Sequence, residues 1–142
     1  MIQFNVSLWP VLLAAVSNLV LGSLWYGPLF GKQLRRTAKL TKEEVEKEEK
    51  KEGGKVKMYL KMFVGDFVMA YILAIIIVSM SISTFLAGAM IGFLIWFGFL
   101  LPMSVNKLMW HKDKASVEGI KIHAGYHLTV LVIVGALLAI WL

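Results

Sequence analysis

The sequence predicts an all-α, polytopic membrane protein with four transmembrane helices in a compact up-down bundle. Of its 142 residues, 58% are hydrophobic and only 17% are charged, which is more apolar than a water-facing domain of this size. Four long apolar runs are separated by three connections, and all 15 Lys and Arg residues fall in or beside two of these connections. This pattern predicts one transmembrane domain over residues 1–142, with both termini on the non-cytoplasmic side.

The first apolar run, at about 6–27, is long enough to cross the roughly 30 Å of a bilayer's hydrocarbon core. Pro10 falls in the first turn, where its missing N–H is not needed, and Gly27 followed by Pro28 is expected to stop the helix. No Lys or Arg precedes the run and a dense basic segment follows it, so it does not fit the pattern of a signal peptide.

The segment 31–57 is rich in Lys, Arg and Glu and predicts a charged cytoplasmic loop. Thr41 and Glu44 form a T-x-x-E capping box, and Gly53 with Gly54 supplies a stop, so a short polar helix is expected inside the loop. The alternative is a disordered charged linker, because few apolar side chains are available to dock such a helix.

Three further apolar runs complete the bundle. Pro102, in the second of them, deletes a backbone hydrogen bond and predicts a kink, while Ser116 is expected to cap the last helix. A tight turn joins the first two of these helices into a hairpin. The predicted helices cover about 58–80, 85–107 and 117–142.

The basic residues define the orientation. Eleven Lys and Arg residues lie in the first connection and four around the third, and none flanks the opposite face. The positive-inside rule therefore predicts that these connections are cytoplasmic and that the protein is a multi-pass protein of the inner (cytoplasmic) membrane. The net charge of +6 is explained by this topology, so nucleic acid is not an expected partner, whereas membrane lipids are. The absence of cysteine excludes disulfides and thiolate metal sites.

The ionisable residues within the spans fall at similar depth in the cytoplasmic half of the predicted bundle. Asp66 lies about two turns into the second helix, and His123 and His127 lie one turn apart on one face of the fourth. Such groups cost at least about 2.5 kcal/mol to insert, so each is a candidate functional residue. Other polar side chains that could join this cluster are Asn18, Asn106 and Tyr126.

Three interpretations of this cluster remain open. Asp and His side chains can hold helices together by interhelical hydrogen bonds, which is the structural alternative. A carboxylate beside two imidazoles can also relay protons or cations near neutral pH. A metal site is the third alternative, but nothing in the sequence fixes the convergence of its ligands. No metal site and no cofactor are therefore expected.

Small residues predict close packing of the third and fourth helices. Gly88 and Gly92 form a GxxxG pattern, and Gly135 with Ala139 repeats the spacing. These glycines can serve contacts within one chain or between copies, and we expect a homo-oligomer. Trp96 lies mid-span, so its indole N–H is expected to find a partner inside the bundle.

The segment from Leu21 to Lys32, LGSLWYGPLFGK, has a distinctive core of Trp25, Tyr26, Gly27 and Pro28. This motif, with AGAMIGFLIWFGF in the third helix and IKIHAGYHL in the fourth, resembles the family called domain of unknown function 1761. The resemblance implies a compact four-helix membrane protein of prokaryotic type, with no established activity or catalytic residues. The long loop rich in Lys and Glu departs from that family. The motif itself could bind a lipid headgroup or another substrate, or only anchor the helix at the interface.

No catalytic motif was found, because the chain has no nucleophile elbow, phosphate-binding glycine loop or HExxH pattern. An enzyme is therefore not expected, and no residue is assigned a catalytic role. The sequence favours a small homo-oligomeric transporter or channel for a proton, an ion or a small solute. The alternative is a membrane scaffold whose charged cytoplasmic loop binds lipid headgroups or an unidentified protein partner.

Overall fold

A computed structural model describes residues 1–37, 42–50 and 54–142, and contains no strand among them. The prediction of four helices long and apolar enough to cross a membrane is confirmed: they span Leu8–Leu29, Tyr59–Ser79, Phe85–Trp110 and Lys114–Trp141. In chain order, the elements are α1 (Leu8–Leu24), a π-helical turn (Trp25–Leu29), α2 (Gly31–Thr37), α3 (Lys42–Lys50), α4 (Gly54–Ser79), α5 (Phe85–Ile95), a second π-helical turn (Trp96–Leu100), α6 (Leu101–Trp110) and α7 (Lys114–Trp141).

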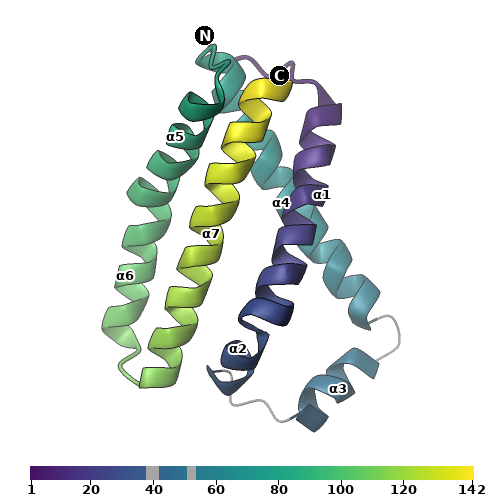
Figure 1. The fold of residues 1–142 in the computed structure, drawn as a ribbon, viewed down its shortest axis with the longest axis vertical. Coiled ribbons are helices and arrows are strands. Elements are labelled where there is room, and N and C mark those ends of the chain that lie inside the picture. The colour runs from purple at the N-terminus through teal and green to yellow at the C-terminus, as the bar shows by residue number, and fades with distance from the viewer. Residues whose placement is uncertain (38–41, 51–53) are drawn as a thin grey trace.

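The spans form an up-down bundle in which α7 contacts all the other spans (Figure 1). The continuous α5–α6 rod packs mainly on α7, whereas α4 crosses behind α1 in the same view. Both termini and the α4–α5 turn lie at one end of the molecule, and α2 and α3 lie at the other (Figure 1).

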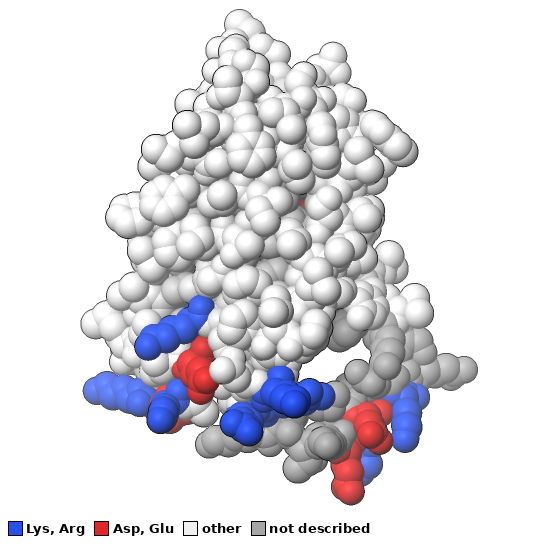
Figure 2. Space-filling view, in the orientation of Figure 1, with Lys and Arg blue, Asp and Glu red and all other residues white. Residues whose placement is uncertain are grey.

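Charged side chains gather at the end that carries α2, α3 and the α6–α7 turn, and the body above them is almost free of charge on the face shown in Figure 2. We call this end the charged end. A wide uncharged band bounded by a charged rim suits a chain that crosses hydrocarbon, because ionised groups are costly there. Which side of the membrane the charged end faces remains a prediction of the positive-inside rule.

The first helix does not stop at Gly27 and Pro28, as the sequence had suggested. It widens instead into the π-helical turn Trp25–Leu29, which contains Pro28 and in which Phe30 N donates to Trp25 O over 2.9 Å. A turn with i→i+5 pairing shifts the ladder by one residue, so the proline can be accommodated without ending the helix. Helix α2 then begins at once, at Gly31.

The disruption predicted at Pro102 also takes the form of a π-helical turn, Trp96–Leu100, after which α6 resumes with Pro102 as its second residue. The two π-helical turns share a sequence pattern, Trp-aromatic-Gly, at Trp25 and Trp96. The first span of each helical hairpin, α1 before α4 and α5–α6 before α7, therefore contains a π-helical turn.

The prediction that Ser116 caps the last helix is wrong. Asp113 is the N-cap, and its Oδ2 accepts hydrogen bonds from the backbone N of Ser116 at 3.0 Å and from its Oγ at 2.9 Å. Helix α7 therefore begins at Lys114. A carboxylate is the better cap, because it both accepts from an unpaired N–H and complements the positive end of the helix dipole.

Within the charged connection the structure describes a helix, α3, that carries an exposed ion pair between Glu46 and Lys50 at 3.6 Å. Thr41 of the expected capping box and Gly53 of the expected stop lie outside the described residues. Gly54 is the first residue of α4.

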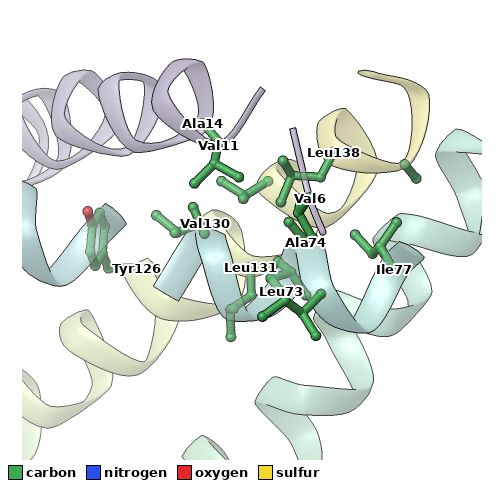
Figure 3. Packing of buried hydrophobic residues seen from close by; sticks show 14 residues of the cluster. Val6, Val11, Ala14, Leu73, Ala74, Ile77, Tyr126, Val130, Leu131 and Leu138 are labelled. Atoms are coloured by element: carbon green, nitrogen blue, oxygen red, sulfur yellow. The ribbon is translucent and has the colours of Figure 1, made fainter. Parts of the chain in front are cut away.

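The buried core lies between α1, α4 and α7, mainly in the half of the bundle away from the charged end (Figures 1 and 3). Its side chains are apolar, so this half of the bundle is sealed by packing. The best-buried members are Val11 and Ala14 of α1, Ala70, Leu73, Ala74 and Ile77 of α4, and Val130, Val134 and Leu138 of α7.

The glycine pattern serves a contact within the chain. Gly88, Gly92 and Gly135 are buried where α5 meets α7. A Cβ atom on Gly88 would collide with the carbonyl of Gly135, and one on Gly92 with the carbonyl of Leu131. Glycine is therefore required for the two backbones to approach this closely, which is how helices associate in lipid.

Candidate functional site

The structure divides the predicted polar cluster into two groups. Asn18 of α1 and Asp66 of α4 belong to two spans that pack on each other, whereas His123 and His127 line a cavity between α6 and α7. Asn106 is exposed and borders a second cavity, so it does not join Asn18 and Asp66.

Asn18 is the one polar residue that is fully buried among the described residues. Neither its Oδ1 nor its Nδ2 has a hydrogen-bond partner in the described chain. An unpaired buried amide costs on the order of 1–3 kcal/mol, so a side chain in this state needs an explanation other than stability. Only its backbone is engaged, since Asn18 O accepts from Tyr126 Oη at 3.4 Å.

Helical spacing puts Asp66 of α4 at the same depth in the bundle as Asn18 of α1. A Cβ atom on Gly22 of α1 would lie 3.9 Å from Met62 Cε of α4, and the two helices run antiparallel. One turn further from the charged end, α1 presents Asn18 and α4 presents Asp66. The Oδ2 atom of Asp66 is buried and also has no partner among the described residues. By this helical spacing, two polar side chains without a hydrogen-bond partner are expected at the same level of the membrane-spanning region.

Tyr126 connects this pair to α7 and to the family motif. It interacts electrostatically with Asp66, and its ring lies 4.9 Å from that of Tyr26. Gly22 makes room for its hydroxyl, because a Cβ there would lie 2.9 Å from Tyr126 Oη. Tyr126 is therefore the bridge between Asn18, Asp66 and the aromatic residues of the first π-helical turn.

The motif residues Trp25 and Tyr26 are more than interfacial anchors. Trp25 Nε1 donates to Ile122 O at 3.3 Å, and Tyr26 Oη shares a 2.8 Å hydrogen bond with His123 Nδ1. Gly27 and Pro28 are exposed, and a Cβ atom on Gly27 would meet no other atom within 4 Å. The partner expected for Trp96 is also present, because its Nε1 donates to Ala124 O at 2.9 Å. Both π-helical turns thus place a tryptophan on neighbouring carbonyls of α7.

A cavity of about 370 Å³ lies between α6 and α7 toward the charged end. Its polar lining consists of Ser104, Lys107, His123 and His127, and its apolar lining of Leu100, Met103, Ile120 and Ala124. Lys107 and Met103 also border the second cavity, of about 330 Å³, with Asn106, Trp110 and His111. Among the described residues, no three His, Asp or Glu side chains form a group that could hold a metal ion.

Sequence reasoning named Tyr26 as part of the family motif but not as a partner of His123, and it did not select Ser104 or Lys107. For the interaction of Tyr126 with Asp66, the sequence did contain a signal. Lys61, Gly65 and Asp66 in α4 have the same spacing as Lys121, Gly125 and Tyr126 in α7. Asp66 and Tyr126, which interact electrostatically, therefore occupy equivalent positions in the two hairpins. The contact of Tyr26 with His123 had no such signal, because it depends on the π-helical turn.

Comparisons with known proteins identify the family of the chain. The family model described as "Protein of unknown function (DUF1761)" matches residues 9–139, nearly the whole chain. No curated protein and no solved structure matches this chain. Since the match takes in all four spans, both π-helical turns and the polar residues between them, the chain is a multi-pass membrane protein that belongs to this family.

Proposed function

We propose that the protein is a small transporter or channel that takes up a proton at Asp66 from the charged end of the bundle. The observation that carries the proposal is the buried Oδ2 of Asp66, which has no hydrogen-bond partner among the described residues; the side-chain amide of Asn18, on the neighbouring helix α1, has none either. An ionisable group inside a span is costly, so its presence without a structural partner favours a functional role over helix–helix attachment.

A chain of proton-exchanging groups leads from Asp66 toward the charged end. Asp66 interacts with Tyr126, whose ring contacts those of Tyr26 and His127. Tyr26 Oη then reaches His123 Nδ1, and both histidines line the 370 Å³ cavity. Imidazoles titrate near neutral pH and phenols both donate and accept protons, so these groups can pass a proton once water or side-chain rotation joins Asp66 to Tyr126 and Tyr126 to Tyr26, between which the described chain has no hydrogen bond.

The opposite half of the bundle offers no comparable route among the described residues, because its core is apolar. A single chain would therefore load a proton from one side only. Release to the other side requires a rearrangement of the bundle or a second copy, and this supports the homo-oligomer that the sequence predicts. The positive-inside rule predicts that the loading side is cytoplasmic. We further propose, from the family resemblance, that the membrane is the inner membrane of a prokaryotic cell.

Proteoliposomes with an internal pH-sensitive dye test the proposal. Under an imposed membrane potential, the wild-type protein should acidify or alkalise the lumen faster than empty vesicles, and Asp66→Asn should abolish the difference. Glu118→Gln is the matched control, since Glu118 is exposed on α7 and its loss should leave the flux unchanged. Wild-type flux in Asp66→Asn, or no flux in the wild type, would reject the proposal.

Orientation is tested separately by cysteine labelling. Lys47 lies in α3 at the charged end and Ser83 in the turn at the other end, so cysteines at these positions should react from opposite sides of the membrane. Labelling of both from one side would contradict the topology on which the loading direction depends.

A scaffold role is the second candidate, favoured by the collection of charge at one end of the molecule (Figure 2). Helix α3 carries exposed Glu and Lys side chains that can meet a protein surface or lipid headgroups. A pull-down that depends on residues 31–57, together with an absence of proton flux, would favour this role.

A further inference from the structure

All three histidines of the chain gather around one lysine. His123 and His127 line the cavity between α6 and α7, His111 lines the second cavity, and Lys107 borders both. The cavities also share Met103, so they adjoin along α6. We call the two together the α6–α7 groove. One lysine and three histidines, which can become protonated, thus border one groove. Of these four, only His123 has a hydrogen bond to the proposed proton route, through Tyr26.

No carboxylate lines the groove, because none of its lining residues in the described part of the chain is Asp or Glu. Asp113, in the turn beneath the groove, accepts two hydrogen bonds from Ser116 and caps α7. Lys107 acts electrostatically on both His123 and His127, so the three groups repel one another when protonated. An anion bound among them would remove that repulsion.

The hydrogen bond to Tyr26 prepares His123 for an anion. When the Tyr26 phenol donates to His123 Nδ1, the neutral imidazole carries its proton on Nε2, which is then a donor available to the cavity. Lys107 supplies an ammonium group at the end of a flexible stem. A phosphate oxygen can accept hydrogen bonds from both.

The remaining lining indicates which anion. Leu100, Met103 and Ile120 form apolar walls, and Met103 is 63% exposed on the surface that would face lipid. Because α5 and α6 pack mainly on α7, their outer face leaves large side chains such as Phe97 and Phe99 exposed. Basic pockets between spans at the headgroup level, continuous with an apolar face, suit a lipid better than a free ion.

We infer that the α6–α7 groove binds the phosphate of an anionic phospholipid, with Lys107 and His123 as donors and the acyl chains along the exposed face of α5 and α6. The inference does not rest on the proposed proton function, because it requires only the groove and its charge. A bound lipid would also cover the outer side of the His123 and His127 imidazoles.

Native mass spectrometry of the detergent-solubilised protein tests the inference. Titration with dioleoyl phosphatidylglycerol should give one retained lipid, and the same titration with dioleoyl phosphatidylcholine should retain much less. Lys107→Gln should weaken phosphatidylglycerol binding about fivefold, the effect expected for one basic contact with an anionic lipid. Lys121→Gln is the matched control, since Lys121 is exposed on α7 outside the groove lining and its loss should change binding little.

Equal retention of the two lipids, or equal losses in Lys107→Gln and Lys121→Gln, would overturn the inference. Displacement of the lipid by excess inorganic phosphate would also overturn it, because the site would then recognise a free anion. Asp66→Asn should retain phosphatidylglycerol like the wild type, so a failure of the proton function would leave this result intact. Because Lys107 is exposed, its substitution should not affect folding, which an unchanged thermal melt would verify.

Discussion

The α5/α7 interface and the α1/α4 interface are both built on small residues, but they differ in the polar groups they contain. Between α5 and α7, Gly88, Gly92 and Gly135 bring backbone against backbone. Between α1 and α4, Ala14 and Ala70 are fully buried in the same way, but the next turn toward the charged end brings in Asn18 and Asp66. One interface is apolar throughout, and the other changes from apolar to polar along its length.

This difference separates residues that hold the bundle together from residues that serve a site. In lipid, close packing is the main source of helix association, so the α5/α7 interface needs no polar group. The α1/α4 interface keeps two unpaired polar side chains at a cost in stability, which is typical of functional sites. Substitutions in the two interfaces should therefore have opposite effects on stability.

Gly92→Leu should produce the largest change. The side chain would meet the backbone of Leu131, which cannot move aside, so α5 must separate from α7. We expect a loss of about 3 kcal/mol in the free energy of unfolding, at the upper end for an overpacked site. Equilibrium unfolding of the two proteins in mixed detergent micelles measures this difference in free energy. Gly98→Leu is the control on the same rod, where a Cβ meets nothing and the loss should be small. Equal losses in the two variants would show that the glycine contact is not tight.

Asn18→Leu should change stability in the opposite direction. Leucine has the same branching and number of side-chain heavy atoms, and it removes two polar atoms without a partner. The expected gain is about 1 kcal/mol, because replacing an unsatisfied buried polar group relieves its desolvation. The same unfolding measurement applies, with Asn106→Leu as the control at an exposed position. A loss of stability would indicate that Asn18 has water or a ligand as a partner, which would sharpen the case for a site.

Tyr126→Phe should separate structural from functional effects within the α1/α4/α7 junction. It removes the 3.4 Å hydrogen bond to Asn18 O, which should cost about 0.6 kcal/mol, the average for interhelical hydrogen bonds in a membrane protein. Tyr71→Phe is matched, since Tyr71 Oη donates to Phe4 O at 3.3 Å far from the site. The two variants should lose similar stability, but only Tyr126→Phe should slow proton flux. Equal flux in both would remove Tyr126 from the proposed route.

The sequence predicted the spans well because hydrophobic length and charge placement are properties of the local chain. It also placed Asp66, His123 and His127 in the same half of the bundle, since depth follows from counting residues along each helix. It could not divide them between two sites, because the rotation of each helix depends on its neighbours. Asp66 acts electrostatically on Tyr126, and Gly22 of α1 leaves the room that the Tyr126 hydroxyl occupies.

Local geometry was the other limit on prediction. Pro28 and Pro102 were expected to stop and to kink their helices, and both lie in or directly after a π-helical turn. Such a turn is stabilised by contacts far along the chain, here Trp25 with Ile122 and Trp96 with Ala124. The Trp-aromatic-Gly pattern shared by the two turns lies within each helix, but it does not indicate which carbonyls of α7 accept from the two tryptophans.

Ser81→Gly should have the smallest effect and concerns the turn that joins the two interfaces. Ser81 has a φ of 53° and lies just beyond the end of α4, where Ile82 N donates to Ile77 O and Ser81 N to Val78 O, both over 3.0 Å. This pairing requires a left-handed residue, in which a Cβ costs about 1–2 kcal/mol. Glycine removes that cost but loses more entropy on folding, so a net gain of about 0.5 kcal/mol is expected. Ser83→Gly, outside the left-handed region, should be neutral or slightly destabilising. If both substitutions lower the unfolding free energy equally, the left-handed conformation of Ser81 costs no measurable stability. Backbone strain in the turn between α4 and α5 would then be excluded.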